Sequence, residues 1–334
     1  MSEHCAELEV KHLCKYFPAG RKKVLHAVDD VSFRIEKGQT LGIVGESGCG
    51  KTTCGKTSIG LLSRTSGEVL FRGVDIHSMS KQERFELTGH VQMVFQDPYA
   101  SLDPHQLVYD IIAEGIRNHK RAKNREEEKQ MVLELLDMVG LRPEHASRNV
   151  HEFSGGQRQR IGIARALSVD PDFLFCDEPV SALDVSIQAQ IINLLIRLKK
   201  QRGLTMMFIA HDLSVVRHIS DNIAVMYLGN MIEYSPAADL YKHPYHPYTE
   251  ALLSAIPIAD PDLAQQRKPI ILEGDAPSPV DPPEGCGFCD RCSKRMNICR
   301  KKRPELREIE NGHMVACHLY NEIEIKEEKK TNEV

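Results

Sequence analysis

The sequence of 334 residues predicts an α/β fold with a parallel sheet as its core, an antiparallel β subdomain, a helical subdomain and a small cysteine-rich C-terminal extension. Apolar runs alternate with a helical pattern over residues 173–209, which is typical of parallel strands joined by crossover helices. Apolar residues alternate with polar ones within the first 40 residues, which indicates antiparallel strands. Five of the ten cysteines lie between residues 286 and 317, so the C-terminal third differs in composition from the rest.

Composition excludes several classes of protein. With 41 % hydrophobic and 27 % charged residues, the chain can bury a core and is not disordered. A formal net charge of −4 argues against a duplex-DNA binder that relies on positive charge. The absence of Trp and the 6 % aromatic content disfavour a stacking platform for single-stranded nucleic acid. No apolar run is long enough to span a bilayer, and the N-terminus does not resemble a signal peptide, so we expect a cytosolic location.

The N-terminal part is expected to be mostly β structure. An extended run begins at Leu8-Glu9-Val10, and a second run has alternating apolar residues at Val31, Phe33 and Ile35 before the turn at Lys37-Gly38. Residues 40–44 form a short apolar run typical of a strand buried on both faces. A glycine-rich loop and a helix are expected next, and β structure resumes at 67–71.

The middle of the chain is expected to form a helical insertion over roughly 105–150, within a helical subdomain of about 97–165. Asn124 and Glu127 make a capping box for one helix, and Gly140 ends it. Strands are expected at 173–176 and 205–209, and a hairpin turn is expected at Gly229-Asn230.

The C-terminal third predicts a separate region. A first domain is expected at 6–235, an extension with the cysteines at 236–320, and a flexible tail at 321–334. Residues 236–285 contain many prolines and are interpreted as a loop-rich connector.

Residues 45–52, Gly-Glu-Ser-Gly-Cys-Gly-Lys-Thr, fit the phosphate-loop pattern G-x-x-x-x-G-K-[ST] between a strand and a helix. Glycines let backbone N–H groups converge on phosphate oxygens at a helix N-terminus. Lys51 is predicted to reach the outer phosphates, and the Thr52 hydroxyl is predicted to bind Mg²⁺. The alternative is a flexible turn without a ligand.

Two carboxylates, Asp177 and Glu178, follow the apolar run 173–176. Because the carboxyl ends of parallel strands lie beside the nucleotide crevice, Asp177 is predicted to hold Mg²⁺ and Glu178 to orient or deprotonate a water. The alternative is a helix cap. His211 follows the next strand and is predicted to face the γ-phosphate, although a single histidine is more often structural.

Four further motifs resemble those of ATP-binding cassette (ABC) ATPases over about residues 6–235. Phe153-Ser154-Gly155-Gly156-Gln157 is similar to the family's signature motif, although many members have Leu at its first position. Ser181-Ala182-Leu183-Asp184 resembles the D-loop, Gln96 the Q-loop residue and His211 the switch histidine. The resemblance implies a P-loop NTPase of the ABC cassette type.

The resemblance also implies the roles of the site residues. Glu178, His211 and Gln96 would be catalytic, and Thr52, Gln96 and Asp177 would hold Mg²⁺. Tyr16 or Phe17 would stack on adenine. The residues implied to contact ATP are Tyr16, Phe17, Gly45, Glu46, Ser47, Gly48, Cys49, Gly50, Lys51, Thr52, Thr53, Gln96, Asp177, Ser154, Gly155, Gly156, Gln157 and Asp184. Two cassettes would enclose each ATP between the phosphate loop of one and the signature motif of the other.

The C-terminal third resembles the ATPases of oligopeptide/dipeptide importers, through residues 245–253 and the cysteine-containing run 285–317; residues 95–104 are similar to the F-type subunit. This implies a D-type ATPase partner or a homodimer, two transmembrane permease subunits and an extracytoplasmic substrate-binding protein. It also implies a peripheral location at the cytoplasmic face of the membrane, with the residues just after Gln96 contacting the membrane subunits.

The cysteine spacing alone favours a structural Zn²⁺ site, in which Cys289-x-x-Cys292 and His313 or His318 could take part. The resemblance instead implies a 4Fe–4S cluster on Cys286, Cys292, Cys299 and Cys317, with Cys289 outside it; unligated thiols are the third interpretation. In either case the metal would stabilise a loop-rich segment.

Other functions are also compatible with the sequence. The chain could be a soluble ABC ATPase of translation or DNA repair, although such proteins usually carry two cassettes or long coiled-coil inserts. It could be an importer ATPase for nickel chelates or glutathione. A metal-binding regulatory module with a vestigial nucleotide site is disfavoured by the complete motif set.

Overall fold

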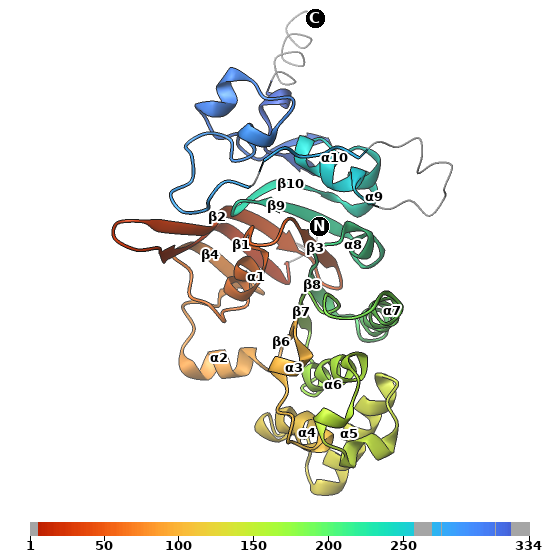
Figure 1. The fold of residues 1–334 in the computed structure, drawn as a ribbon. Helices are drawn as coiled ribbons and strands as arrows, with labels where there is room; N and C mark the ends of the chain where they lie inside the picture. Colours follow the sequence, from red (N-terminus) through yellow and green to blue (C-terminus); the bar gives the residue numbers. More distant parts are fainter. Residues whose placement is uncertain (1–5, 257–268, 275, 311, 322–334) are drawn as a thin grey trace, which may run out of the picture. The chain divides into compact units, whose positions relative to one another are not determined.

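The computed structural model describes residues 6–256, 269–274, 276–310 and 312–321 (Figure 1). The predicted tail at 321–334 lies outside these residues except for Asn321. The chain divides into two compact units, which are described separately. Unit 1 contains the described residues up to 9 and residues 34–40 and 69–210, and unit 2 contains 10–33, 41–68 and the described residues from 211 onward.

Unit 1 is built on three parallel strands in the order β8-β7-β6. The strands β7 and β8 occupy the two apolar runs in which strands were predicted, and both are buried along their whole length. The register pairs Phe173 with Val91 on one side and with Thr205 on the other. The elements of the unit are β4 (Ser66–Phe71, which begins in unit 2), β5 (Val74–Asp75), α2 (Lys81–Leu87), β6 (Val91–Val94), α3 (Pro98–Ser101), α4 (Val108–Asn118), α5 (Arg125–Met138), η1 (Pro143–Ser147), η2 (Val150–Glu152), α6 (Gly155–Leu167), β7 (Phe173–Asp177), α7 (Val185–Arg202) and β8 (Thr205–Ile209).

Helices α3 to α6 cover most of the segment predicted to be helical, and they lie together at one end of unit 1 (Figure 1). Helix α5 begins after Asn124, whose Oδ1 accepts the N–H of Glu127 at 2.9 Å. The predicted capping box is only half correct, because the Glu127 carboxylate accepts the N–H of Lys123 rather than that of Asn124. Gly140 has φ 74° just after the helix, so it ends α5 as predicted.

Unit 2 contains the strand order β11-β12-β10-β9-β3, in which β3 and β9 are parallel and the other neighbours are antiparallel. The strands β1 and β2 are neighbours in a second sheet. In β2, Val31, Phe33 and Ile35 are buried, as the alternation predicts. The elements are β1 (Leu8–Pro18), β2 (Val24–Ile35), β3 (Thr40–Val44), α1 (Lys51–Ser58), α8 (Leu213–Ile219), β9 (Asn222–Tyr227), β10 (Asn230–Pro236), α9 (Ala237–Lys242), α10 (Pro247–Ser254), η3 (Cys289–Arg291), η4 (Asn297–Arg300), β11 (Arg307–Glu310), β12 (His313–Val315) and η5 (His318–Tyr320).

The hairpin between β9 and β10 lies one residue earlier than predicted. Asn230 pairs with Tyr227, so Leu228 and Gly229 form the two-residue turn instead of Gly229-Asn230. Both turn residues have positive φ, 49° and 79°, which is the requirement of a type I′ hairpin turn. The sequence analysis placed the turn one residue too late, because leucine rarely adopts a positive φ and Leu228 therefore did not look like a turn residue.

The segment after β10 contains more regular structure than the predicted loop-rich connector. Pro236 precedes α9 and Pro247 is the first residue of α10, where a missing N–H is tolerated. Strand β12 then pairs antiparallel with β10, with Tyr234 opposite Met314. The C-terminal third therefore extends the sheet of unit 2 and is not an independent appendage within that unit.

No helix in the described part of the chain is long and apolar enough to cross a bilayer.

Candidate functional site

The phosphate-loop motif lies where the sequence predicts it, between β3 and α1 in unit 2. Gly50 has φ 102°, and a Cβ there would lie 2.0 Å from the carbonyl oxygen of Ala27. A Cβ on Gly45 would lie 2.2 Å from the carbonyl oxygen of Met226. Both glycines are therefore required by close backbone approaches, which excludes a flexible turn without structural constraint.

Lys51 is the first residue of α1, and it is only 4 % exposed. Its Nζ donates to the carbonyl oxygens of Gly45 and Glu46 at 2.8 and 2.9 Å. The ammonium group is thus held inside the loop by neutral acceptors, which a phosphate could replace. Ser47 and Gly48 are exposed at the rim of the loop, and Thr52 and Thr53 are half-buried in the first turn of α1.

The β9–β10 turn supports the phosphate loop. Gly229 donates its N–H to the carbonyl oxygen of Cys49 at 2.9 Å and accepts the N–H of Asp29 at 2.8 Å. Burial raises the pKa of the Cys49 thiol, so Cys49 serves as a buried apolar residue of the loop. The sequence did not single out Gly229 for this contact, and its only signal was a glycine in a hairpin turn.

Tyr16 and Phe17 lie on β1 and have different surroundings. Tyr16 donates its hydroxyl to Asp29 Oδ1 at 2.5 Å, and its ring lies 4.2 Å from the ring of His26. Phe17 makes neither contact; Lys15 Nζ lies over its ring, 4.8 Å from the centroid. Successive strand residues point to opposite faces, so the two rings do not share a surface.

His211 is exposed in unit 2 directly before Asp212. Asp212 caps α8 by accepting the N–H of Ser214 at 2.7 Å. The predicted switch histidine therefore lies directly before the N-cap of α8, and the capped start of this helix fixes the backbone next to His211.

In unit 1 the predicted carboxylates lie at the end of β7. Asp177 is 2 % exposed, and Glu178 follows it with φ 45°. The Glu178 backbone N–H donates to the carbonyl oxygen of Ile209, and its Oε2 accepts from Gln96 Nε2 at 2.9 Å. The structure therefore brings two of the predicted catalytic residues, Gln96 and Glu178, into direct contact.

The loop that carries Gln96 is fastened to α6. Gln159 is 2 % exposed and donates to the carbonyl oxygen of Phe95, and Arg165 donates to that of Ser101 at 2.7 Å. The sequence analysis did not identify Gln159 or Arg165, because a helical glutamine or arginine carries no positional signal by itself.

The signature motif forms the N-terminus of α6. Ser154 caps the helix and forms a capping box with Gln157, at 3.4 and 3.1 Å. A Cβ on Gly156 would lie 2.5 Å from Ile187 Cγ2, so α6 approaches α7 closely. Asp184 caps α7 by accepting the N–H of Ile187 at 3.0 Å. The signature and D-loop motifs are thus neighbours in unit 1, with the Ser154 side chain exposed.

The predicted cysteine ligands lie together in unit 2. Cys286, Cys292, Cys299 and Cys317 line one small pocket, and Cys289 and His318 line it as well. Burial raises the pKa of Cys286 to about 12 and that of Cys317 to about 11. As placed, no group of three or more His, Cys, Asp or Glu side chains among the described residues could hold a metal ion. The donor set fits a soft metal chemically, but the side chains are not arranged around one.

His313 does not take part in this pocket. Its Nε2 lies 2.7 Å from Glu233 Oε1, and both side chains are almost completely buried. His313 therefore lies outside the pocket of the predicted ligands, whereas His318 lines it and donates from Nε2 to the carbonyl oxygen of Lys302 at 2.8 Å.

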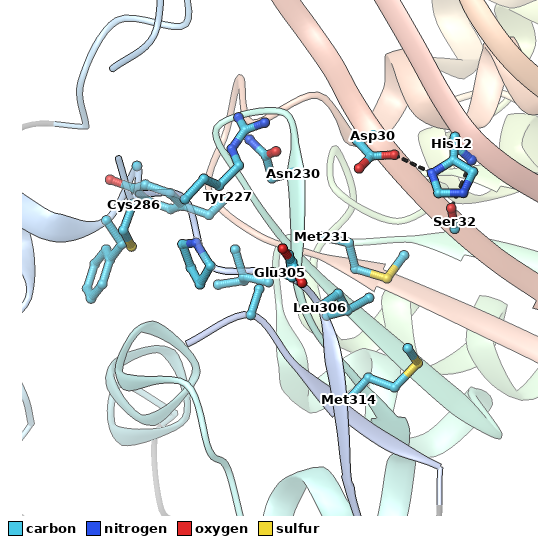
Figure 2. Close-up of a pocket in the computed structure, with 16 residues that line it drawn as sticks. His12, Asp30, Ser32, Tyr227, Asn230, Met231, Cys286, Glu305, Leu306 and Met314 are labelled. Carbon is cyan, nitrogen blue, oxygen red and sulfur yellow. Dashed lines mark hydrogen bonds and ion pairs between the residues drawn. The ribbon is translucent and has the colours of Figure 1, made fainter. Parts of the chain in front are cut away.

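A larger pocket in unit 2 lies beside the cysteine segment. Figure 2 shows the labelled side chains of Met231, Leu306 and Met314 in its apolar part and those of Tyr227 and Cys286 at another side. His12 and Asp30, which lie 2.7 Å apart, line the pocket as well. The sequence analysis did not predict this pocket.

Comparisons with known proteins place the chain in a family. Residues 28–181 match the family described as ABC transporter, and residues 232–299 match the C-terminal region of oligopeptide/dipeptide transporters. A putative oligopeptide transport ATP-binding protein of Bacillus subtilis (strain 168) is 54 % identical over 96 % of this chain and 97 % of its own length. An oligopeptide transport ATP-binding protein of Salmonella typhimurium is 50 % identical over 88 % of each chain.

Solved structures show the same fold. A Clostridium perfringens protein that is part of an ABC transporter complex aligns with a TM-score of 0.64 and 28 % identity, over 71 % of this chain and 91 % of that one. An ATP-binding cassette solved as a dimer with ADP and phosphate aligns with a TM-score of 0.63 and 28 % identity, over 69 % and 98 %. The predicted ABC cassette fold is confirmed, and this chain belongs to the ABC transporter ATPases, among the oligopeptide transport ATP-binding proteins.

Proposed function

We propose that this protein hydrolyses ATP to power a peptide importer, by closing and opening a dimer of cassettes that is coupled to membrane permease subunits. The observation that carries the proposal is the combination of an intact phosphate loop with a C-terminal region matching oligopeptide/dipeptide transporters. Homologues named for oligopeptide transport match nearly the full chain, which supports the peptide as cargo. The first domain is proposed to end near residue 235, where the second match begins.

The phosphate loop is the proposed anchor of the nucleotide. Lys51 exchanges its contacts with the Gly45 and Glu46 carbonyls for the phosphates, and the N–H groups at the start of α1 donate to them. The oxygen donors of Thr52, Gln96 and Asp177 are of the type that Mg²⁺ prefers. Bound Mg²⁺ supplies charge neutralisation for the β- and γ-phosphates.

Glu178 is the proposed base that orients and deprotonates the attacking water, and Gln96 positions its carboxylate through the 2.9 Å hydrogen bond. His211 is proposed to contact the γ-phosphate. Because the signature serine is exposed at a helix N-terminus, we assign Ser154, Gly155, Gly156 and Gln157 to a nucleotide bound by a second cassette. Asp184 holds the start of α7 beside that motif.

Phe17 is the proposed adenine-stacking residue. Tyr16 already places its ring against His26 and its hydroxyl on Asp29. Within the described residues, the ring of Phe17 is contacted by Lys15 Nζ, which also donates to Ser63 Oγ at 3.3 Å, and an adenine base could replace this one cation–π contact.

A 4Fe–4S cluster held by Cys286, Cys292, Cys299 and Cys317 is the proposed occupant of the cysteine pocket, with Zn²⁺ as the alternative. The thiols are soft donors gathered in one place, which supports either metal. Anaerobic purification tests the choice: the cluster predicts a brown protein with absorbance near 400 nm, and colourless protein with bound zinc would contradict it.

The proposed partners are a second ATPase subunit of the D type or a second copy of this chain, two permease subunits and an extracytoplasmic peptide-binding protein. The exposed residues after Gln96, including Tyr99, are proposed to contact the permeases at the cytoplasmic face of the membrane. The family of the chain and the proposed partners support this location.

Reconstitution tests the function. The complete assembly in vesicles, with Mg²⁺ and ATP, is expected to release phosphate and accumulate a radiolabelled oligopeptide, and Lys51→Ala in this chain should impair both. If the assembly releases phosphate and takes up nickel chelates or glutathione but no peptide, the cargo is that compound and not a peptide. Absence of hydrolysis would overturn the proposal altogether.

A further inference from the structure

The C-terminal extension reaches the phosphate loop through Glu46, the residue directly after Gly45. Both carboxylate oxygens of Glu46 accept from Arg291 Nη1, at 3.0 and 2.9 Å. The Glu46 backbone N–H donates to Tyr248 Oη at 2.9 Å, and its carbonyl oxygen accepts from Lys51 Nζ. Every polar group of Glu46 therefore has a partner, and two of these partners come from the C-terminal third of unit 2.

The charge on Glu46 is unfavourable for the proposed ligand. A carboxylate within a phosphate-binding loop repels an anionic nucleotide, and this repulsion is strong where water is partly excluded. The Arg291 side chain is 11 % exposed and cancels the charge at short range. It also holds the carboxylate in one place, because Nη1 contacts Tyr227 Oη at 3.4 Å in addition to Glu46.

Stability alone does not explain this ion pair. The Arg291 side chain is 11 % exposed and that of Glu46 is 32 % exposed, and an ion pair that is partly buried in this way gains little net free energy, because its charges lose part of their hydration. Arg291 Nε is buried and has no hydrogen-bond partner within the described chain, which adds a cost. The ion pair thus contributes little to the free energy of folding, whereas it favours phosphate binding by the loop because it neutralises a negative charge there.

Arg291 also belongs to the cysteine segment. It is the last residue of η3, directly between Cys289 in the same turn and Cys292, and both cysteines line the thiol pocket. A change in the thiol pocket would move the backbone of this turn, and with it the guanidinium group. The ion pair is therefore a short physical connection from the thiol pocket to the phosphate loop, all within unit 2.

We propose that Arg291 is a positioning residue for ATP: it neutralises Glu46 and orients it in the phosphate loop, so that the cysteine-containing extension sets the affinity of the loop for nucleotide. This inference rests on the proposed function, because it assumes that the phosphate loop binds ATP. It assigns to the extension a role in nucleotide binding in addition to any structural role.

The test is a comparison of ATP affinity and turnover in the full-length protein. Arg291→Met keeps the apolar volume and removes the charge, so we expect the Kd for ATP to rise about tenfold while kcat changes little. In a Glu46→Gln background the same Arg291→Met substitution should raise the Kd less than twofold, because no carboxylate remains to be neutralised. Arg291→Lys, which keeps the charge, should recover most of the affinity.

Arg307→Met is the matched control. Arg307 lies in the same C-terminal region and pairs with the exposed Glu305 at 3.1 Å, and it does not line the thiol pocket, so its loss should leave the Kd for ATP unchanged. An Arg291→Met protein that binds ATP like the wild type would overturn the inference. An equal loss of affinity in the Glu46→Gln background would overturn it too, because it would indicate a general structural role.

Two further results separate this inference from the proposed function. If the wild type binds no ATP, or if Lys51→Ala binds it undiminished, the proposed function fails. If Lys51→Ala loses ATP while the Arg291 variants keep it, only the role of Arg291 fails. Should Arg291→Met not fold, Arg291→Lys decides, since a tenfold loss of affinity with the charge retained contradicts neutralisation.

Discussion

At the scale of single residues, the clearest feature is the backbone of Glu178. A positive φ of 45° is unfavourable for a residue with a side chain, by about 1–3 kcal/mol, and it persists only where neighbours enforce it. The Glu178 N–H donates to Ile209 and the Glu178 carbonyl oxygen accepts from the N–H and the hydroxyl of Ser181, so hydrogen bonds on both sides hold this backbone. Strain of this kind concentrates at functional sites, which agrees with the proposed role of Glu178 as the base.

Glu178→Gln tests that role. The amide keeps the shape and can still contact Gln96, but it cannot accept a proton, so ATP turnover is expected to fall by about 10²–10⁴-fold while ATP binding remains. Phosphate release and equilibrium binding of ATP, measured on the same preparation, check the two parts separately. Turnover within threefold of the wild type would exclude Glu178 as the essential base.

Phe17→Ala and Tyr16→Phe form a second pair of residue-scale variants. Loss of an aromatic ring that stacks on a base costs about 1–3 kcal/mol, so Phe17→Ala should raise the Kd for ATP by roughly 5- to 150-fold. Tyr16→Phe keeps the ring and removes only the hydrogen bond to Asp29, so it should weaken the local packing without an equal loss of affinity. A Phe17→Ala protein that binds ATP like the wild type, together with a loss of affinity in Tyr16→Ala, would assign the adenine to Tyr16.

At the scale of elements, helices α6 and α7 approach each other at Gly156. An alanine methyl there would lie 2.5 Å from Ile187 Cγ2, so Gly156→Ala is expected to destabilise unit 1 by about 1–3 kcal/mol through overpacking. Urea unfolding measures this free energy. Gly155→Ala is the matched control, because its nearest contact is an ordinary 3.4 Å from Leu183.

A second substitution tests whether the clash with Ile187 causes the loss of stability. Ile187→Ala removes the clashing methyl, so adding it to Gly156→Ala should cost less than the sum of the two single substitutions. Additive free energies would mean that the neighbouring helices relax around the new methyl group.

Strand β10 carries a second element-scale feature, the completely buried Glu233. Its carboxylate accepts the N–H groups of Tyr245 and His246 at 2.7 and 3.1 Å and contacts His313 at 2.7 Å. Glu233→Ala would leave these buried groups unsatisfied, and we expect a loss of about 3–5 kcal/mol in the free energy of unfolding. Glu305→Ala, an exposed carboxylate at the surface, should change it by less than about 1 kcal/mol.

The sequence predicted the elements with a strong local signal and missed contacts that depend on distant residues. The parallel strands, the helical segment and the phosphate loop each follow from a local pattern of apolar residues or glycines. The predicted position of the turn at Leu228-Gly229 was wrong by one residue. Hydrogen bonds to Cys49 and Asp29 fix Gly229 in the turn, and a leucine gives no turn signal in the sequence. Arg291 contacts a residue 245 positions away, which no spacing rule can anticipate.

At the scale of the whole molecule, the C-terminal segment is stabilised in two different ways. Its strand β12 is fixed by pairing with β10, whereas residues 286–300 form only short 3₁₀ turns around the thiol pocket. Such turns bury little apolar surface by themselves, so a bound metal would supply a large share of their stability. The proposed metal would therefore give the five pocket cysteines a role in the fold as well as in the proposed link to the phosphate loop.

Metal removal is the last prediction. Because burial raises the pKa values of Cys286 and Cys317 to about 12 and about 11, both thiols are protonated at neutral pH without metal, and metal binding must release their protons. The apparent metal affinity should therefore fall as pH is lowered, and a chelator should strip the metal faster at pH 6 than at pH 8. Stripped protein should unfold at a temperature several degrees lower. Cys292→Ser should contain less metal than the wild type, whereas Cys176→Ser, in β7 of unit 1, should retain it. Equal metal content in the wild type and both variants would contradict a thiolate site.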